Sequence, residues 1–164
     1  MTVDERSRIA FVRLRAELVA VESSMELLAA RAHQLASAGG EPTAGDAALI
    51  AVSLHGWYNA VESTLERIAV AFEGEIPRGG DSHRALLRGM TLDLGSVRPP
   101  VIARDTELEL VELLKFRHFF RHAYTIELDW SRLLANVEHL NRAHPLLSRD
   151  LAVVMSAIDA IIAG

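Results

Sequence analysis

One ten-residue segment, KFRHFFRHAY at 115–124, gathers side chains that could carry acid–base chemistry. Histidine can act as a general acid or base, arginine can stabilise an anionic transition state, and tyrosine can orient a group by hydrogen bonding. These groups are sufficient for metal-free cleavage of RNA, in which a base activates the 2′-hydroxyl and an acid protonates the leaving 5′-oxygen. The residues concerned are Lys115, Arg117, His118, Arg121, His122 and Tyr124.

Two simpler interpretations of the same segment stay open. Basic side chains near the carboxyl end of a helix interact favourably with the helix dipole, which would account in part for Arg117 and Arg121. His118 and His122 have the i, i+4 spacing of a metal-binding pair, but no Asp, Glu or Cys stands at a companion position on their face. We therefore expect no metal and no other cofactor.

A helical wheel at about 100° per residue divides the segment into two faces. Arg117, His118, Arg121, His122 and Tyr124 fall within an arc of about 160°, and the opposite arc, which we assign to the core, holds Leu113, Phe116, Phe119, Phe120 and Ala123. One turn upstream, the Arg/His face continues as an apolar strip of Leu110, Val111 and Leu114. We expect another helix or a second subunit to cover this strip, which would leave the Arg/His cluster at the rim of a cleft.

The elements that position this cluster all read as helices, because apolar residues recur at helical spacing and sustained alternation is missing. We predict helices from a Thr2/Glu5 capping box to about Ser37, from near Asp46 to about Phe72, over 83–90 after a cap at Asp81 or Ser82, from about Asp105 through the cluster, and from Trp130 after a cap at Asp129. Pro145 should break or kink the last of these before a final helix at about 146–162. The fold class predicted is all-α, an antiparallel helical bundle.

Bulk properties limit the possible functions. A chain of 164 residues fits one domain, 1–164, with a loop-rich segment at about 74–104. A net charge of −5 argues against a general nucleic-acid coat protein without excluding a local basic site. The chain has no cysteine, no uncharged leader segment at its start and no apolar run long enough to span a membrane, so we expect a soluble cytoplasmic protein without membrane partners.

The segment from Arg117 to Tyr124 has the form R-x4-H-x-Y with a polar residue after the arginine, and this form resembles the signature of HEPN-domain ribonucleases. The stretches WYNAVESTLERIAVAFEGEIP, SHRALLRGM and RPPV look like the HepT-like toxins of HEPN–MNT toxin–antitoxin pairs. The resemblance covers roughly residues 45–140.

The resemblance implies a homodimer in which two copies of Arg117 and His122 form one composite catalytic cleft for an RNA substrate. His118 carries over as the polar residue after the arginine. Tyr124 matches the tyrosine that an MNT-type nucleotidyltransferase antitoxin can modify with AMP. Arg121 and Lys115 lie outside the signature and would serve only as weak phosphate contacts.

Several other residues have more ordinary interpretations. We place Asn59 and Glu62 on a solvated or interface polar face in preference to a role at the cleft, and for His83 we favour a turn-forming role over a role beside the cleft. Arg98 and Arg104 could extend an RNA track but are more simply exposed surface residues. No partners are visible in the sequence for the remaining histidines, His33, His55, His139 and His144.

The function that these observations favour is a metal-independent endoribonuclease toxin of the HepT type, neutralised by a nucleotidyltransferase antitoxin. The alternative is a non-catalytic HEPN-like binding partner of a nucleotidyltransferase. A histidine-pair metalloprotein is the third possibility.

Overall fold

The computed structural model describes residues 5–39, 41–122 and 128–164, with the backbone alone at positions 121 and 122. These ranges contain five α-helices and no β-strand: α1 Glu5–Ser37, α2 Ala44–Glu73, α3 Ser82–Met90, α4 Arg104–His122 and α5 Trp130–Ala163. The prediction of an all-α bundle is confirmed. None of these helices is apolar enough over its length to cross a lipid bilayer.

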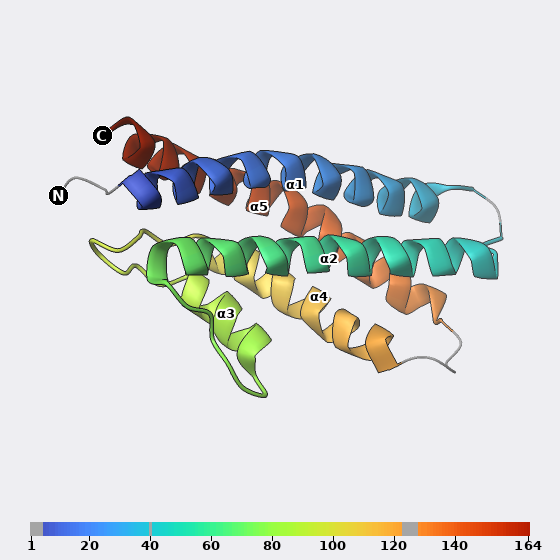
Figure 1. Cartoon of the computed structure of the whole chain (residues 1–164). Helices are drawn as coiled ribbons and strands as arrows, with labels where there is room; N and C mark the ends of the chain where they lie inside the picture. The colour runs from blue at the N-terminus through green and yellow to red at the C-terminus, as the bar shows by residue number, and fades with distance from the viewer. Residues whose placement is uncertain (1–4, 40, 123–127) are drawn as a thin grey trace.

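The four long helices form an antiparallel bundle, and the short α3 is attached to its side (Figure 1). α1 lies along α2 and α5, while α4 packs against α2 and α5. α3 contacts α2 and α4 only. The beginning of α1 and the end of α5 meet at one end of the bundle, where Arg8 Nε donates a hydrogen bond to the carbonyl oxygen of Ile162 at 2.8 Å. α2 is therefore the central helix, with neighbours on several sides.

The core follows from the apolar stripe along α2. Its members are at most 1% exposed: Ile50, Leu54, Trp57, Val61, Leu65 and Ile68. Burying one such side chain contributes about 1.5–3 kcal/mol, so this single stripe supplies a large part of the free energy that holds the bundle together.

Side-chain caps fix the beginnings of two helices. Thr43 Oγ1 accepts from the backbone N–H of Asp46, whose carboxylate accepts in return from the N–H of Thr43, so α2 starts with a reciprocal capping box. The predicted start near Asp46 was two residues late, because Asp46 is the third residue of the helix and closes the box from there. Asp129 caps α5 as predicted, accepting from the N–H groups of Ser131 and Arg132. Thr2 of the other predicted capping box lies outside the described residues.

The predicted break at Pro145 is wrong, because α5 runs without interruption from Trp130 to Ala163. Proline in a helix interior costs about 3 kcal/mol through a lost hydrogen bond and a steric clash. The side chains of Leu140, Ala143 and Leu147 are at most 1% exposed on either side of it. Burial of this stripe against the other helices outweighs the local cost.

One buried arginine, Arg98, fastens the irregular segment between α2 and α4. Arg98 is 2% exposed and binds three backbone carbonyls, those of Gly89, Leu92 and Pro99, together with the carboxylate of Glu73. It is thus a buried structural residue, and neither of its predicted surface roles holds. Arg104 is exposed, as expected, and pairs with Glu107.

Asp150 on α5 holds the beginning of α4. Its Oδ2 accepts from the N–H of Ala103 at 2.9 Å and from the hydroxyl of Thr106 at 2.5 Å. The carboxylate is only 7% exposed, and Arg149 donates to its other oxygen at 3.0 Å. This tertiary cap fixes the axial position of α4, and with it the residues near the other end of that helix.

Candidate functional site

Arg117 on α4 is held by side chains from two other helices. Its Nε donates to Oδ1 of Asn59 at 2.8 Å, and its Nη2 lies 3.1 Å from Oε1 of Glu62, both on α2. Its Nη1 lies 3.5 Å from Nε2 of His83 on α3. The Arg117 side chain is 12% exposed, so the guanidinium is mostly buried but still reaches the surface. We call Asn59, Glu62, His83 and Arg117 the Arg117 cluster.

Glu62 joins the other members of the cluster. Its Oε2 lies 2.7 Å from Nδ1 of His83, while its Oε1 faces Arg117. With Glu62 ionised, a proton on Nδ1 of His83 satisfies this hydrogen bond and leaves Nε2 as an acceptor toward Arg117. Arg117, His83 and Glu62 then form a closed ring of interactions, and such a ring restricts the guanidinium to one orientation.

Tyr58 lies on another side of the guanidinium. The ring centroid is 5.8 Å from the Arg117 carbon, within the range of a cation–π contact. The Tyr58 hydroxyl is buried and has no hydrogen-bond partner among the described residues. Burial first, and then the nearby charge of Glu62, raise the pKa of Tyr58 well above its ordinary value. Tyr58 is therefore a neutral, apolar support for Arg117.

The structure overturns the preferred interpretation of three residues. Asn59 and Glu62 were expected on a solvated or interface face, yet Glu62 is 7% exposed and both contact Arg117. His83 was given a turn-favouring role, but it contacts both Glu62 and Arg117. The reason is that α2 has neighbours on several sides, so residues outside its main apolar stripe are covered by α3 and α4.

The other predicted site residues are only partly described. His118 is exposed, and Lys115 is exposed and pairs with Glu112 at 2.6 Å. His122 is the last residue of α4, but its side chain and that of Arg121 are outside the described part of the structure. Tyr124 is likewise outside it. The structure thus fixes Arg117 and leaves its pairing with His122 as a prediction.

The two apolar groups predicted on α4 are covered to different degrees. On the core face, Leu113 and Phe116 are buried as predicted, and Phe119 and Phe120 are half-buried. In the strip, Leu110 is fully buried within its own chain, while Val111 and Leu114 are half-buried. The chain's own helices therefore provide cover for the strip, and a second subunit is not needed to explain Leu110.

The four histidines that lacked visible partners all have one. His55 contacts Asn59 at 2.9 Å, and the other pairs are His33 with Asn141, His139 with Glu109, and His144 with Trp57. No group of three or more potential metal ligands occurs in the described part of the chain. His55 extends the polar contacts around Asn59 and lies against Phe120, with ring centroids 5.3 Å apart.

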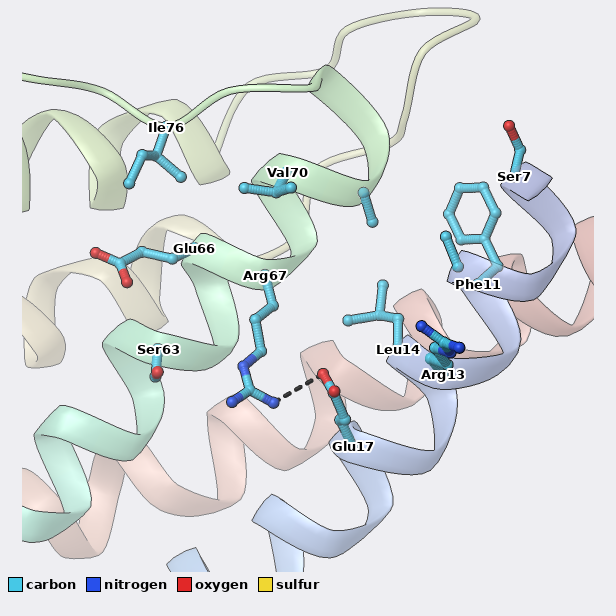
Figure 2. A pocket seen from close by; sticks show the side chains of 12 residues that line it. Ser7, Phe11, Arg13, Leu14, Glu17, Ser63, Glu66, Arg67, Val70 and Ile76 are labelled. Carbon is cyan, nitrogen blue, oxygen red and sulfur yellow. Dashed lines mark ion pairs between the residues drawn. The ribbon is translucent and has the colours of Figure 1, made fainter.

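A separate groove runs between α1 and α2 (Figure 2). Phe11, Leu14 and Val70 give it an apolar lining, and an ion pair of 2.7 Å between Arg67 and Glu17 crosses it. No residue of the predicted catalytic segment lines this groove. Ser63 and Glu66 line both this groove and the hollow beside Arg117, so the two are neighbours, and the candidate chemistry lies where α3 and α4 pack against α2.

Comparison with known proteins gives one result. A family model described as HepT-like protein matches residues 49–158, while no curated protein and no solved structure matches the chain. The matched range begins in the second turn of α2 and ends near the end of α5, so it includes every residue of the Arg117 cluster. Because the match covers more than half of the chain, the protein belongs to the HepT-like family of HEPN-type proteins.

Proposed function

We propose that this protein is a metal-independent endoribonuclease toxin of the HepT type, with Arg117 and His122 as its catalytic residues. The observation that carries the proposal is the fixed position of Arg117, which three side chains from α2 and α3 hold at the surface of a HepT-like fold. His122 follows five residues later on the same helix, a little more than one turn away.

The guanidinium of Arg117 has donors left for a substrate. Of its five N–H groups, contacts with Asn59, Glu62 and His83 engage three, which leaves one on each terminal nitrogen. Two parallel N–H donors match two non-bridging oxygens of a phosphodiester. A donor pair that is already oriented stabilises the charge of the pentacoordinate phosphorus without reorganisation during the reaction.

The reaction needs one proton acceptor and one proton donor. A neutral imidazole takes the proton of the 2′-hydroxyl as its oxygen attacks phosphorus, and a protonated imidazole gives a proton to the departing 5′-oxygen. The products are a 2′,3′-cyclic phosphate and a 5′-hydroxyl, and the proton count balances without water. In a homodimer, His122 of each copy would take one of these roles in a composite cleft.

Substitution of the two residues tests the proposal. Purified Arg117→Ala and His122→Ala should each lose RNA cleavage and growth inhibition, and both should keep the helical circular dichroism and the oligomeric state of the wild type. His122→Ala is the sharper variant because it leaves the side chains of Arg117, Asn59, Glu62 and His83 unaltered. Unchanged cleavage by purified His122→Ala would contradict the assignment.

A nucleotidyltransferase antitoxin of the MNT type is the partner we propose. Transfer of AMP to the Tyr124 hydroxyl would place a bulky anion seven residues beyond Arg117, where it would compete with the substrate phosphate. Intact mass measurement after co-expression should show one added AMP on the wild type and none on Tyr124→Phe. An equal mass increase on Tyr124→Phe would place the modification elsewhere.

A second candidate function is a non-catalytic partner subunit of a nucleotidyltransferase. One observation favours it: Arg117 is mostly buried and pairs with Glu62, as a purely structural arginine would. Incubation of RNA with the purified wild-type protein separates the two functions. Persistence of intact RNA for hours at high protein concentration would favour the binding partner, whereas cleavage favours the toxin.

A further inference from the structure

Two hollows share residues with the Arg117 cluster. The first lies on the α2 side and is lined by Glu62, Glu66 and Arg117 among others. The second is a groove of about 330 Å³ between α3 and α4. Its lining includes His83 and Arg84 from α3, and Val111, Leu114, Lys115 and His118 from α4. We call it the α3–α4 groove.

The two hollows differ in charge. In the first hollow, Glu62 and Glu66 would repel any phosphate group other than the phosphate that Arg117 binds directly. The α3–α4 groove is lined by the guanidinium of Arg84, the ammonium of Lys115, two imidazoles and the carboxylate of Asp81, while Glu112 pairs with Lys115 and Glu62 contacts His83. A polyanion that reaches Arg117 therefore meets less repulsion along α3 and α4 than along α2.

Arg84 is the cation in the groove that is best placed to bind a ligand. It is exposed, and its guanidinium makes no hydrogen bond or ion pair with any residue that the structure describes. Lys115, in contrast, is paired with Glu112 at 2.6 Å. All donors of the Arg84 guanidinium remain available for a phosphate, whose geometry an arginine matches with two parallel hydrogen bonds.

The groove also has an apolar wall and a size that suits one nucleotide. Val111 and Leu114 are half-buried and line it on the α4 side, where they offer a surface against which a base or ribose can pack. A volume of about 330 Å³ lies at the lower end of the range for small-molecule sites. Basic groups beside an apolar wall are complementary to a nucleotide, which joins an anion to a flat apolar ring.

His83 connects the groove to Arg117, because it lines the groove and contacts the guanidinium. Its ring nitrogens lie 2.7 Å from Oε2 of Glu62 and 3.5 Å from Nη1 of Arg117. His118, also in the lining, follows Arg117 directly in the chain. A nucleotide in the groove would thus be adjacent to the phosphate bound by Arg117.

From these observations we infer that the α3–α4 groove binds one nucleotide of the RNA strand, next to the phosphodiester that is cleaved. Arg84 contacts its phosphate, and Val111 and Leu114 contact its base or ribose. This inference rests on the proposed ribonuclease function, and it assigns a binding role to α3, which contains no residue of the R-x4-H-x-Y signature.

Affinity for RNA tests the groove separately from catalysis. The probe is a fluorescein-labelled, single-stranded RNA of mixed sequence, and its dissociation constant is measured on full-length His122→Ala protein so that the RNA stays intact. Adding Arg84→Ala to this protein should raise the dissociation constant about tenfold. It should also lower the slope of log affinity against log salt concentration by the amount expected for about one phosphate contact. Arg84→Lys should recover part of the loss. The matched control is Arg88→Ala, an exposed arginine on the same helix outside the groove, which should bind within about twofold of its parent.

In the otherwise wild-type enzyme, Arg84→Ala should raise KM with little change in kcat. Equal RNA affinity of Arg84→Ala and Arg88→Ala would overturn the inference, and the ribonuclease proposal would survive if Arg117→Ala still abolished cleavage. If Arg84→Ala weakens self-association but leaves RNA affinity unchanged, the groove contacts a second copy of the protein, and the inference is again overturned. If the wild type neither binds nor cleaves RNA, the proposed function and this inference both fail.

Discussion

At the residue scale, the central feature is a guanidinium on α4 whose partners come from two other helices, α2 and α3. Breaking a buried ion pair by removing one partner is costly because the other charge is left without compensation. Glu62 is the critical partner, since it contacts both Arg117 and His83. Its role is to hold Arg117 in position, and it needs no contact with the substrate.

Glu62→Gln tests this positioning role. The substitution keeps the shape of the side chain but removes the charge and turns one acceptor toward Arg117 or His83 into a donor. We expect a loss of about 2 kcal/mol in the free energy of unfolding and a fall in kcat of at least tenfold with a smaller change in KM. Glu66→Gln, one turn further along α2 in the same hollow, is the matched control and should change neither by much.

A kinetic effect of Glu62→Gln no larger than that of Glu66→Gln would show that the ring of contacts around Arg117 has no part in activity. NMR of the His83 ring gives an independent readout, because the Nδ1–H tautomer should dominate in the wild type and lose its preference in Glu62→Gln. A structural role limited to folding would leave kcat unchanged in the molecules that fold.

The R-x4-H-x-Y motif pointed to Arg117 as a site residue, whereas the residues of α2 and α3 that contact it were not predicted. The main apolar stripe of α2 occupies a narrow arc, which made Asn59 and Glu62 look solvated. A second set of residues at helical spacing, Ala51, Tyr58, Glu62 and Ala69, is also buried. That second stripe was visible in the sequence, but its partners on α3 and α4 come from distant segments whose packing the local pattern does not encode.

At the element scale, the position of α4 depends on its attachment to α5. Asp150 binds the beginning of α4 and is buried, so the register of α4 relative to the bundle is set about three turns before Arg117. Helix ends were predictable within a few residues from caps and glycines. The continuity of α5 through Pro145 was not, since it depends on burial on both sides of the proline.

Replacement of Asp150 by alanine should therefore destabilise the protein. We expect a loss of about 2–3 kcal/mol, because the N–H of Ala103 and the hydroxyl of Thr106 lose their acceptor. Asp159→Ala on the same helix removes a carboxylate that forms an exposed ion pair with Arg15, and it should cost no more than about 1 kcal/mol. Urea denaturation of both variants gives the comparison, and equal losses would contradict a special role for Asp150.

At the scale of the whole molecule, the all-α bundle and the family agree with what composition, helical periodicity and the R-x4-H-x-Y motif indicated. An acidic chain can act on RNA if its cations are concentrated on one surface, and α3 and α4 supply such a concentration beside Arg117. The proposed homodimer would bring two copies of this surface together. The pattern of apolar and polar residues in the sequence does not specify the contact between two copies, because that contact depends on how two folded surfaces fit together.

The most direct test of the central claim is an RNA cleavage assay with purified wild-type protein in excess EDTA, with analysis of the new RNA ends. We predict cleavage to 2′,3′-cyclic phosphate and 5′-hydroxyl ends at a rate that EDTA does not change, and loss of these products with Arg117→Ala. Cleavage that stops in EDTA, or that continues at the wild-type rate in Arg117→Ala, would contradict the account.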